Sequence, residues 1–181
     1  MGKIVSYSNQ KGGVGKTTTC VNMAAFLASF GKKVLLVDID PQGNATTGLG
    51  FSKSSLKKSV YNVLIDDEKA EDNILKTELE GLDILPSNID LAGAEVELVY
   101  KKSREKVLKK ALSELREKYD FVMIDCPPSL GLLTINALAA SDSVIIPIQS
   151  EYYALEGLSQ LMNSISLVKQ QLNPALDVDG V

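Results

Sequence analysis

Lysines, threonines and aspartates are grouped in this sequence at spacings that suit phosphate chemistry. The strongest group is a glycine-rich run, QKGGVGKTT at 10–18, which lies between a short apolar run and a segment with helical periodicity. Two further runs, DIDPQG at 38–43 and FVMID at 121–125, place aspartates directly after apolar segments. Lysines neutralise phosphate charge, whereas hydroxyls and carboxylates are ligands of Mg²⁺. The chain has no histidine, so carboxylates, lysines and backbone dipoles must carry any chemistry.

The glycine-rich run is a predicted phosphate-binding loop, because it joins a predicted strand to a predicted helix. Its glycines, at 12, 13 and 15, permit positive φ angles and a close approach of backbone N–H groups to phosphate oxygens. We expect Lys16 to contact the β and γ oxygens, Thr17 to ligate Mg²⁺ and Thr18 to contact the α-phosphate. The alternative is a glycine-rich turn that only caps a helix.

A second signal is the run of four apolar residues that ends in Asp125. A carboxylate at the end of a buried strand is the Walker B pattern, in which it holds Mg²⁺ directly or through water. Pro127 and Pro128 then predict an extended exit from the strand. The pattern is weak alone and strong together with the phosphate-binding loop. The adjacent Cys126 is expected to be an inert, buried thiol.

Strands and helices that could position these residues alternate along the chain. Apolar runs at 3–8, 33–38, 82–86, 119–125 and 143–148 predict buried parallel strands. Segments at 16–30, 91–118, 132–140 and 155–172 have apolar residues at helical spacing, and 177–181 is typical of the start of another strand. This alternation predicts an α/β fold with a doubly wound, mostly parallel sheet flanked by helices.

Composition restricts the class of protein further. The chain has 181 residues, of which 45% are hydrophobic and 23% charged, as expected for one domain with a sizeable core. The net charge of -4 lacks the basic excess of dedicated nucleic-acid binders, so any such contact requires a local patch. Cys20 and Cys126 cannot form a disulfide framework, which favours the cytoplasm. We expect no stable membrane association, because no apolar run approaches about 18 residues.

Three motifs together resemble one family. KGGVGKTT at 11–18, VDIDPQGNATTGLG at 37–50 and IDCPPSLG at 124–131 are similar to the ParA/Soj chromosome and plasmid partitioning ATPases, and the resemblance extends to EYYALEG at 151–157. It implies a P-loop NTPase that uses ATP and Mg²⁺. Gln10 stands where the common motif has its first glycine and Lys11 follows it, which is the deviant Walker A form.

The resemblance also implies roles for individual residues. Lys11 would reach the partner's phosphates across an ATP sandwich dimer, and Gly12 would leave room for the facing loop. Asp40 would position the hydrolytic water, with Asp38 near the magnesium shell. The alternatives are a surface lysine, a turn glycine and aspartates that cap a turn. The expected sets are catalytic Lys11, Lys16 and Asp40; nucleotide-binding Lys11, Gly12, Gly13, Val14, Gly15, Lys16, Thr17 and Thr18; metal-binding Thr17, Asp38 and Asp125; and dimer interface Lys11 and Gly12.

Partners are likewise implied by the resemblance. They are a second copy of the chain when ATP is bound, non-specific DNA and a ParB-type protein that stimulates slow hydrolysis, at the nucleoid within the cytoplasm. The segment 101–118 carries eight basic and three acidic residues and forms either a solvated face or part of a DNA contact. In this family adenine contacts and the main DNA-binding residues lie beyond position 181, so residues 1–181 are expected to be a P-loop domain without its C-terminal strands and helices.

Three other functions remain open on the sequence. A MinD-like division-site ATPase shares the loop but binds membrane through a C-terminal amphipathic helix, and the DPQGN run favours partitioning. An iron–sulfur reductase of the same fold needs cluster cysteines, which Cys20 and Cys126 do not match in position. The third is a nucleotide-binding fragment without turnover. Gly43, Gly48 and Gly50 predict a pliable loop after the second strand.

Overall fold

A seven-stranded sheet forms the centre of the molecule in the computed structural model, which describes residues 2–150 and 154–181. The spatial order is β3-β4-β2-β5-β1-β6-β7, and β3 alone runs antiparallel to its neighbour. The strands are β1 (Lys3–Tyr7), β2 (Val34–Asp38), β3 (Leu75–Lys76), β4 (Leu82–Leu85), β5 (Phe121–Asp125), β6 (Ser143–Ile145) and β7 (Asp177–Gly180). The predicted fold class and the five long predicted strands are confirmed, and so is the additional strand near 177.

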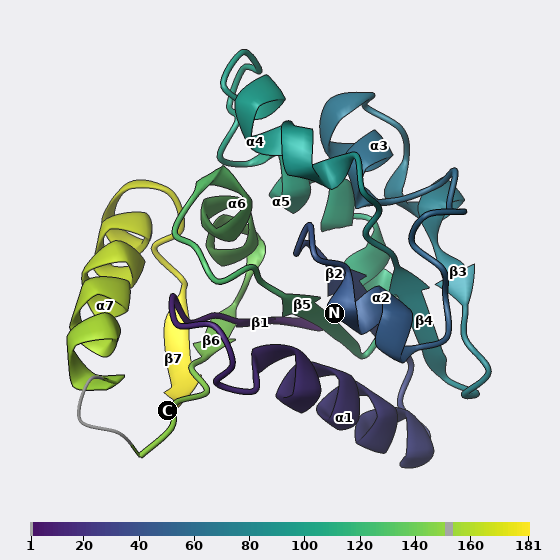
Figure 1. Cartoon of the computed structure of the whole chain (residues 1–181), viewed down its shortest axis with the longest axis horizontal. Helices are drawn as coiled ribbons and strands as arrows, with labels where there is room; N and C mark the ends of the chain where they lie inside the picture. Colours follow the sequence, from purple (N-terminus) through teal and green to yellow (C-terminus); the bar gives the residue numbers. More distant parts are fainter. Residues whose placement is uncertain (1, 151–153) are drawn as a thin grey trace.

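The central strands are apolar over their whole length, because helices cover both faces of the sheet. All five residues of β2 and all four of β4 are buried. Figure 1 shows α1 (Lys16–Ser29) on one face and α4 (Leu91–Leu98), α5 (Val107–Leu112) and α6 (Leu132–Ala140) on the other. Burial on both faces explains the continuous apolar runs that mark parallel strands in the sequence.

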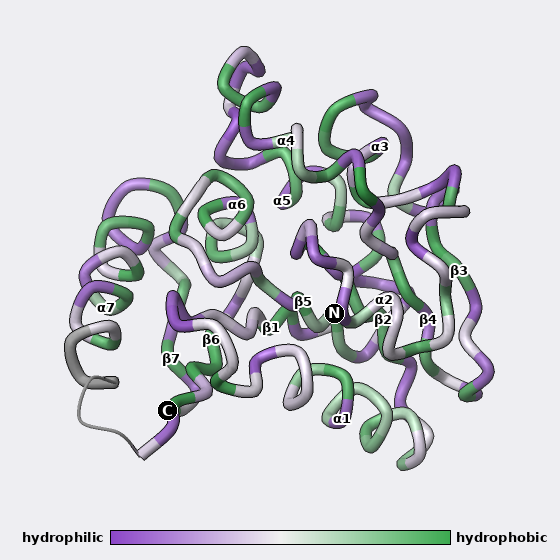
Figure 2. The backbone as a smooth tube through the Cα atoms, viewed as in Figure 1, coloured by the Kyte–Doolittle hydropathy of each residue, from purple (hydrophilic) through white to green (hydrophobic). Residues whose placement is uncertain are grey.

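The long helix α7 (Ala154–Gln171) is amphipathic and packs beside β6 and β7. Leu161, Ile165 and Val168 are spaced at helical intervals and are at most 5% exposed. Figure 2 shows hydrophobic and hydrophilic stretches alternating along this helix. The part of the 151–157 motif formed by 151–153 lies outside the described residues. No helix in the described part of the chain is long and apolar enough to cross a bilayer.

The predicted helical segment 91–118 is wrong as one continuous element. The structure divides it into α4, a turn, α5 and the 3-10 turn η2 (Leu115–Glu117). Ser103 adopts a positive φ of 52° in the turn. Asn136 of α6 then accepts a hydrogen bond from the Leu108 N–H at 3.1 Å and donates to the Arg104 carbonyl at 2.7 Å. This cap comes from a distant residue, so helical periodicity alone could not locate the break.

Residues 44–73 contain elements that the sequence pattern does not predict. They are α2 (Asn44–Gly48), α3 (Val60–Ile65) and the 3-10 turn η1 (Ala70–Asn73). The expectation of a pliable loop is therefore wrong for 44–48. Gly43 begins α2 with φ 60°, and Gly50 follows it with φ 89°, so two of the three glycines serve the ends of a short helix.

The basic segment 101–118 forms ion pairs with acidic residues that lie between α3 and β3. Lys101 pairs with Asp67 at 2.8 Å, and Lys118 pairs with Glu71 at 2.5 Å, although these residues lie 34 and 47 positions apart. Lys102, Lys106, Lys109 and Lys110 remain exposed. The basic segment is thus partly neutralised by its own chain, and its exposed lysines gather on the turn before α5 and on α5 itself.

Candidate functional site

The phosphate-binding loop occupies residues 8–15, between β1 and α1, as the sequence predicts. Gly13 and Gly15 have φ angles of 75° and 88°, which only glycine adopts readily. Gly15 is also the N-cap of α1 and supplies no side-chain cap, so the first N–H groups of a 14-residue helix remain available to an anion. Gly12 differs from the other two, because it has no positive φ and a Cβ there would meet nothing within 4 Å.

Polar side chains hold the loop against the strand ends. The Asn9 amide donates to the Pro147 carbonyl at 2.8 Å, and its oxygen accepts the Lys11 N–H at 3.0 Å. Gln149 donates to the Gly13 carbonyl at 3.2 Å. Neither Asn9 nor Gln149 is among the residues predicted from the sequence. Their only signal is position, since each follows an apolar strand whose end meets the loop.

Lys16 is buried although it carries a charge. It is 6% exposed, and its ammonium donates to the Lys11 carbonyl at 3.0 Å. Burial lowers the pKa of Lys16, while the nearby carboxylates of Asp125 and Asp40 act in the opposite direction. A lysine that is held under a loop of this shape is ready to neutralise a phosphate that enters it.

Asp38 and Asp125 are the last residues of β2 and β5, and they lie opposite each other in the register of the two strands. Both are fully buried. Burial raises the pKa of Asp38 to about 6. Burial and then the charge of Asp38 raise the pKa of Asp125 to about 7, and the nearby Thr17 hydroxyl opposes this shift. Two carboxyl groups that share a dry site in this way favour a cation between or beside them.

The two carboxylates differ in their hydrogen bonds. Asp38 accepts from the Asp40 N–H at 3.2 Å, from the Thr46 N–H at 2.8 Å and from the Thr46 hydroxyl at 2.7 Å. Both oxygens of Asp125 are buried and make no hydrogen bond of good geometry within the described residues, although the Thr17 hydroxyl lies close enough to favour the charged carboxylate. Orphaned buried oxygens of this kind are expected where a ligand completes the site. Asp125 therefore offers free ligand positions, whereas those of Asp38 are occupied by protein donors.

Asp40 is 5% exposed and lies just beyond β2. Its Oδ1 accepts the Gln42 N–H at 2.8 Å, and its carbonyl accepts the Ser87 hydroxyl at 2.8 Å. Its carboxylate contributes to the raised pKa of Asp125 and opposes the fall in the pKa of Lys16, which places all three charges in one neighbourhood. The structure thus brings together the predicted Lys16, Thr17, Asp38, Asp40 and Asp125.

A metal cage made of protein groups alone is not present in the described part of the chain, where no three His, Cys, Asp or Glu side chains are arranged to hold an ion. Mg²⁺ usually takes one or two protein ligands and completes its shell with water and phosphate oxygens. The pair of Thr17 and Asp125 fits that requirement, because Thr17 supplies a hydroxyl beside the orphaned oxygens of Asp125.

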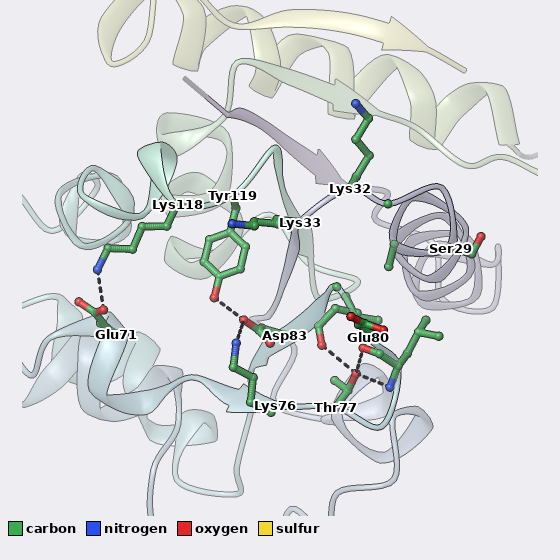
Figure 3. Close-up of a pocket in the computed structure, with 15 residues that line it drawn as sticks. Ser29, Lys32, Lys33, Glu71, Lys76, Thr77, Glu80, Asp83, Lys118 and Tyr119 are labelled. Atoms are coloured by element: carbon green, nitrogen blue, oxygen red, sulfur yellow. Dashed lines mark hydrogen bonds and ion pairs between the residues drawn. The ribbon is translucent and has the colours of Figure 1, made fainter.

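A cavity of about 1020 Å³ lies elsewhere, near the amino ends of β2, β4 and β5. Figure 3 shows Asp83 at its wall accepting bonds from Tyr119 and Lys76, at 2.6 and 2.7 Å. Its acids and lysines largely pair with one another, as Glu71 and Lys118 also do. No predicted site residue lines this cavity, so cavity size does not identify the chemistry of the molecule.

Both cysteines are buried, as expected for Cys126. Cys20 and Cys126 are free thiols and fully buried, and burial raises the pKa of each thiol well above its usual value. A thiol that is neutral and shielded from solvent is a poor nucleophile and a poor metal ligand.

A mostly parallel sheet with a glycine-rich loop after β1 and aspartates at the ends of the neighbouring strands β2 and β5 defines a P-loop NTPase. A family model described as AAA domain matches residues 2–178. The chain is 61% identical over all its 181 residues to the sporulation initiation inhibitor protein Soj of Bacillus subtilis and covers 72% of that protein. It is 56% identical to the chromosome partitioning protein ParA of Myxococcus xanthus, of which it covers 64%. The chain belongs to the ParA/Soj family of partitioning ATPases.

A solved structure agrees with this assignment of the fold. The cobyrinic acid a,c-diamide synthase of Mycobacterium smegmatis, crystallised with an ATP analogue and magnesium, superposes with a TM-score of 0.94. Its sequence is 46% identical, and the match covers 98% of this chain and 72% of that one.

Proposed function

We propose that this chain binds MgATP in the loop at 8–15 and hydrolyses it slowly, with stimulation by a ParB-type partner. The observation that carries the proposal is the group of Lys16, Thr17 and Asp125 at the strand ends, in which both oxygens of Asp125 are buried beside the Thr17 hydroxyl and make no hydrogen bond of good geometry within the described part of the chain. The relative crystallised with an ATP analogue and magnesium supports both ATP and Mg²⁺ as ligands.

The proposed roles follow the local chemistry. The N–H groups of residues 12–15 and of the first turn of α1 surround the phosphates, with Lys16 at the β and γ oxygens and Thr18 at the α-phosphate. Thr17 and Asp125 hold Mg²⁺, which neutralises charge on the phosphates. Asp38 supports this region through its hydrogen bonds and its charge, and Asp40 orients the attacking water.

ATP is further proposed to join two copies face to face, with Lys11 and Gly12 in the interface. Gly12 supports this idea, because neither its φ angle nor any neighbour within 4 Å in its own chain requires a glycine. In the proposed dimer, the phosphate-binding loop of the second copy would face Gly12 and leave no room for a side chain. The dimer would bind DNA without sequence preference at the nucleoid, in chromosome or plasmid segregation, with the exposed lysines of α5 contributing to the contact.

The test compares the wild type with Lys16→Ala and Asp40→Ala. Dimerisation is measured by sedimentation, DNA binding by fluorescence anisotropy and turnover by phosphate release, each with and without ATP. We expect Lys16→Ala to lose ATP-dependent dimerisation and DNA binding, because the phosphate charge is no longer neutralised. Asp40→Ala should keep both and lose turnover.

Matched controls are Lys32→Ala and Asp72→Ala, which remove an exposed lysine and an exposed aspartate that do not belong to the site. Both should behave as the wild type does. DNA binding that is independent of ATP, or turnover in Lys16→Ala equal to that of Lys32→Ala, would contradict the proposal.

A further inference from the structure

Four buried residues at the strand ends form a closed ring of hydrogen bonds. The Thr46 hydroxyl donates to Asp38 Oδ2 at 2.7 Å and accepts the Ser87 N–H at 2.9 Å. The Ser87 hydroxyl donates to the Asp40 carbonyl at 2.8 Å, and the Asp40 N–H returns to Asp38 Oδ1 at 3.2 Å. The ring therefore joins the end of β2, the helix α2 and the segment that follows β4.

The proton positions in this ring are determined by its chemistry. Each hydroxyl has one hydrogen to donate. The Thr46 oxygen receives the Ser87 N–H, so its own hydrogen goes to the carboxylate of Asp38. The hydrogen of Ser87 goes to a carbonyl, which can only accept. Neither hydroxyl rotates freely, because turning either one breaks a bond in surroundings where Thr46 and Ser87 are fully buried.

The ring fixes the backbone of Asp40 on both sides. The Asp40 N–H donates to Asp38, and the Asp40 carbonyl accepts from the Ser87 hydroxyl as well as from the Gly43 N–H at 2.8 Å. The Asp40 carboxylate can therefore reorient by side-chain rotation while its backbone stays in place. Thr46 touches neither the phosphate-binding loop nor Lys16 through any hydrogen bond that the structure records, so it acts on the site through Asp38 and Ser87.

We infer that Thr46 and Ser87 form a latch that positions Asp40 for hydrolysis of the bound nucleotide, with Thr46 as the central positioning residue. The inference rests on the proposed ATPase function and adds two residues to it. The Thr46 hydroxyl makes two hydrogen bonds within the ring, one to Asp38 and one from the Ser87 N–H, whereas the Ser87 hydroxyl makes one, to the Asp40 carbonyl. Loss of Thr46 should therefore have the larger effect.

The test uses the full chain with Thr46→Val, which keeps the shape of the side chain and removes the hydroxyl, and Thr46→Ser, which restores the hydroxyl. Ser87→Ala removes only the bond to the Asp40 carbonyl. Thr47→Val is the matched control, because Thr47 lies on the same helix and its hydroxyl bonds only to the Gly43 carbonyl. Circular dichroism melting confirms that each variant is folded before its kinetics are compared.

We expect Thr46→Val to lower kcat by about tenfold to a hundredfold with little change in KM, because orientation is lost and phosphate contacts are kept. Ser87→Ala should give a smaller loss, and Thr46→Ser should recover most of the activity. Turnover of Thr46→Val equal to that of Thr47→Val would overturn the inference. So would a rise in KM without a fall in kcat, since that would place Thr46 in binding.

Hydrogen exchange separates failure of the latch from failure of the proposed function. In Thr46→Val the Ser87 amide loses its acceptor, so it should exchange at least about tenfold faster than in Thr47→Val. Unchanged exchange refutes the latch even if the wild type is an active ATPase. A wild type without turnover refutes the proposed hydrolysis, and with it the role of the latch in that reaction, whatever the exchange data show.

Discussion

Replacement of Asp125 by asparagine should stabilise the nucleotide-free protein at neutral and alkaline pH. Burial and the charge of Asp38 raise the pKa of Asp125 from 3.8 to about 7. The folded protein therefore keeps a proton that the unfolded chain releases near pH 4, and the stability of the wild type falls as the pH rises from about 4 to about 7. An asparagine side chain carries no charge, so this loss is absent in the variant.

The magnitude follows from the size of the shift. One pKa unit corresponds to about 1.4 kcal/mol, so about three units correspond to about 4 kcal/mol. Burial is the larger cause of this shift and the charge of Asp38 the smaller one, and the asparagine amide, which is also polar, must still be buried. We therefore expect the variant to recover about half of this energy, about 2 kcal/mol. The gain should be complete above about pH 7 and small at about pH 4.5.

Urea denaturation followed by circular dichroism at 222 nm measures this difference, since the chain contains no tryptophan. Curves of the wild type and Asp125→Asn are compared between pH 4.5 and pH 8, without nucleotide or Mg²⁺. Asp72→Asn, at an exposed position, is the control, and its difference in unfolding free energy from the wild type should not increase with pH. A difference that does not depend on pH, or an asparagine variant less stable than the wild type at pH 8, would refute the reasoning.

Three further predictions follow from packing and hydrogen bonds. Gly12→Val should keep nucleotide affinity and block ATP-dependent dimerisation in sedimentation, since a side chain there meets nothing in its own chain; dimers at wild-type level would contradict this. Gly131→Ala places a Cβ against the Glu95 carboxylate, which can turn away, so it should lower the unfolding free energy by at most about 1 kcal/mol, a loss that Glu95→Ala in the same chain should recover. Asn136→Leu leaves the Leu108 N–H without its cap and should cost about 2 kcal/mol in urea denaturation, whereas Asn22→Leu, at an exposed site, should cost much less.

The sequence predicts those parts of the fold that depend on local pattern. The strand ending at Asp125 and the helix starting at Lys16 can be placed within a residue or two, because apolar runs and glycine placement are local signals. The site follows from them, since strand ends that share one edge of a sheet bring their aspartates together. The structure agrees with this expectation, because Asp38 and Asp125 lie opposite each other in the register of β2 and β5.

Features that depend on distant partners could not be predicted. Thr46 and Ser87 lie 41 positions apart, and nothing in either local sequence indicates that they bond to each other or that Ser87 bonds to the Asp40 carbonyl. The break within 91–118 depends on Asn136, which belongs to another helix. The assignment of Lys11 and Gly12 to a dimer interface stays a prediction, because a second copy of the chain must supply the contact.

The cap that Asn136 provides has a mechanical consequence for the exposed lysines. Helix α5 has six residues, which is too short to be stable on its own, and its first turn is held by Asn136 of α6. Helix α6 begins at Leu132, seven residues after Asp125. Lys109 and Lys110 therefore lie on a short helix that is capped by α6, and α6 itself begins close to the strand end that carries Asp125. A displacement of α6 would move these charges with it, through the Asn136 cap and through the buried packing of α5 on α6.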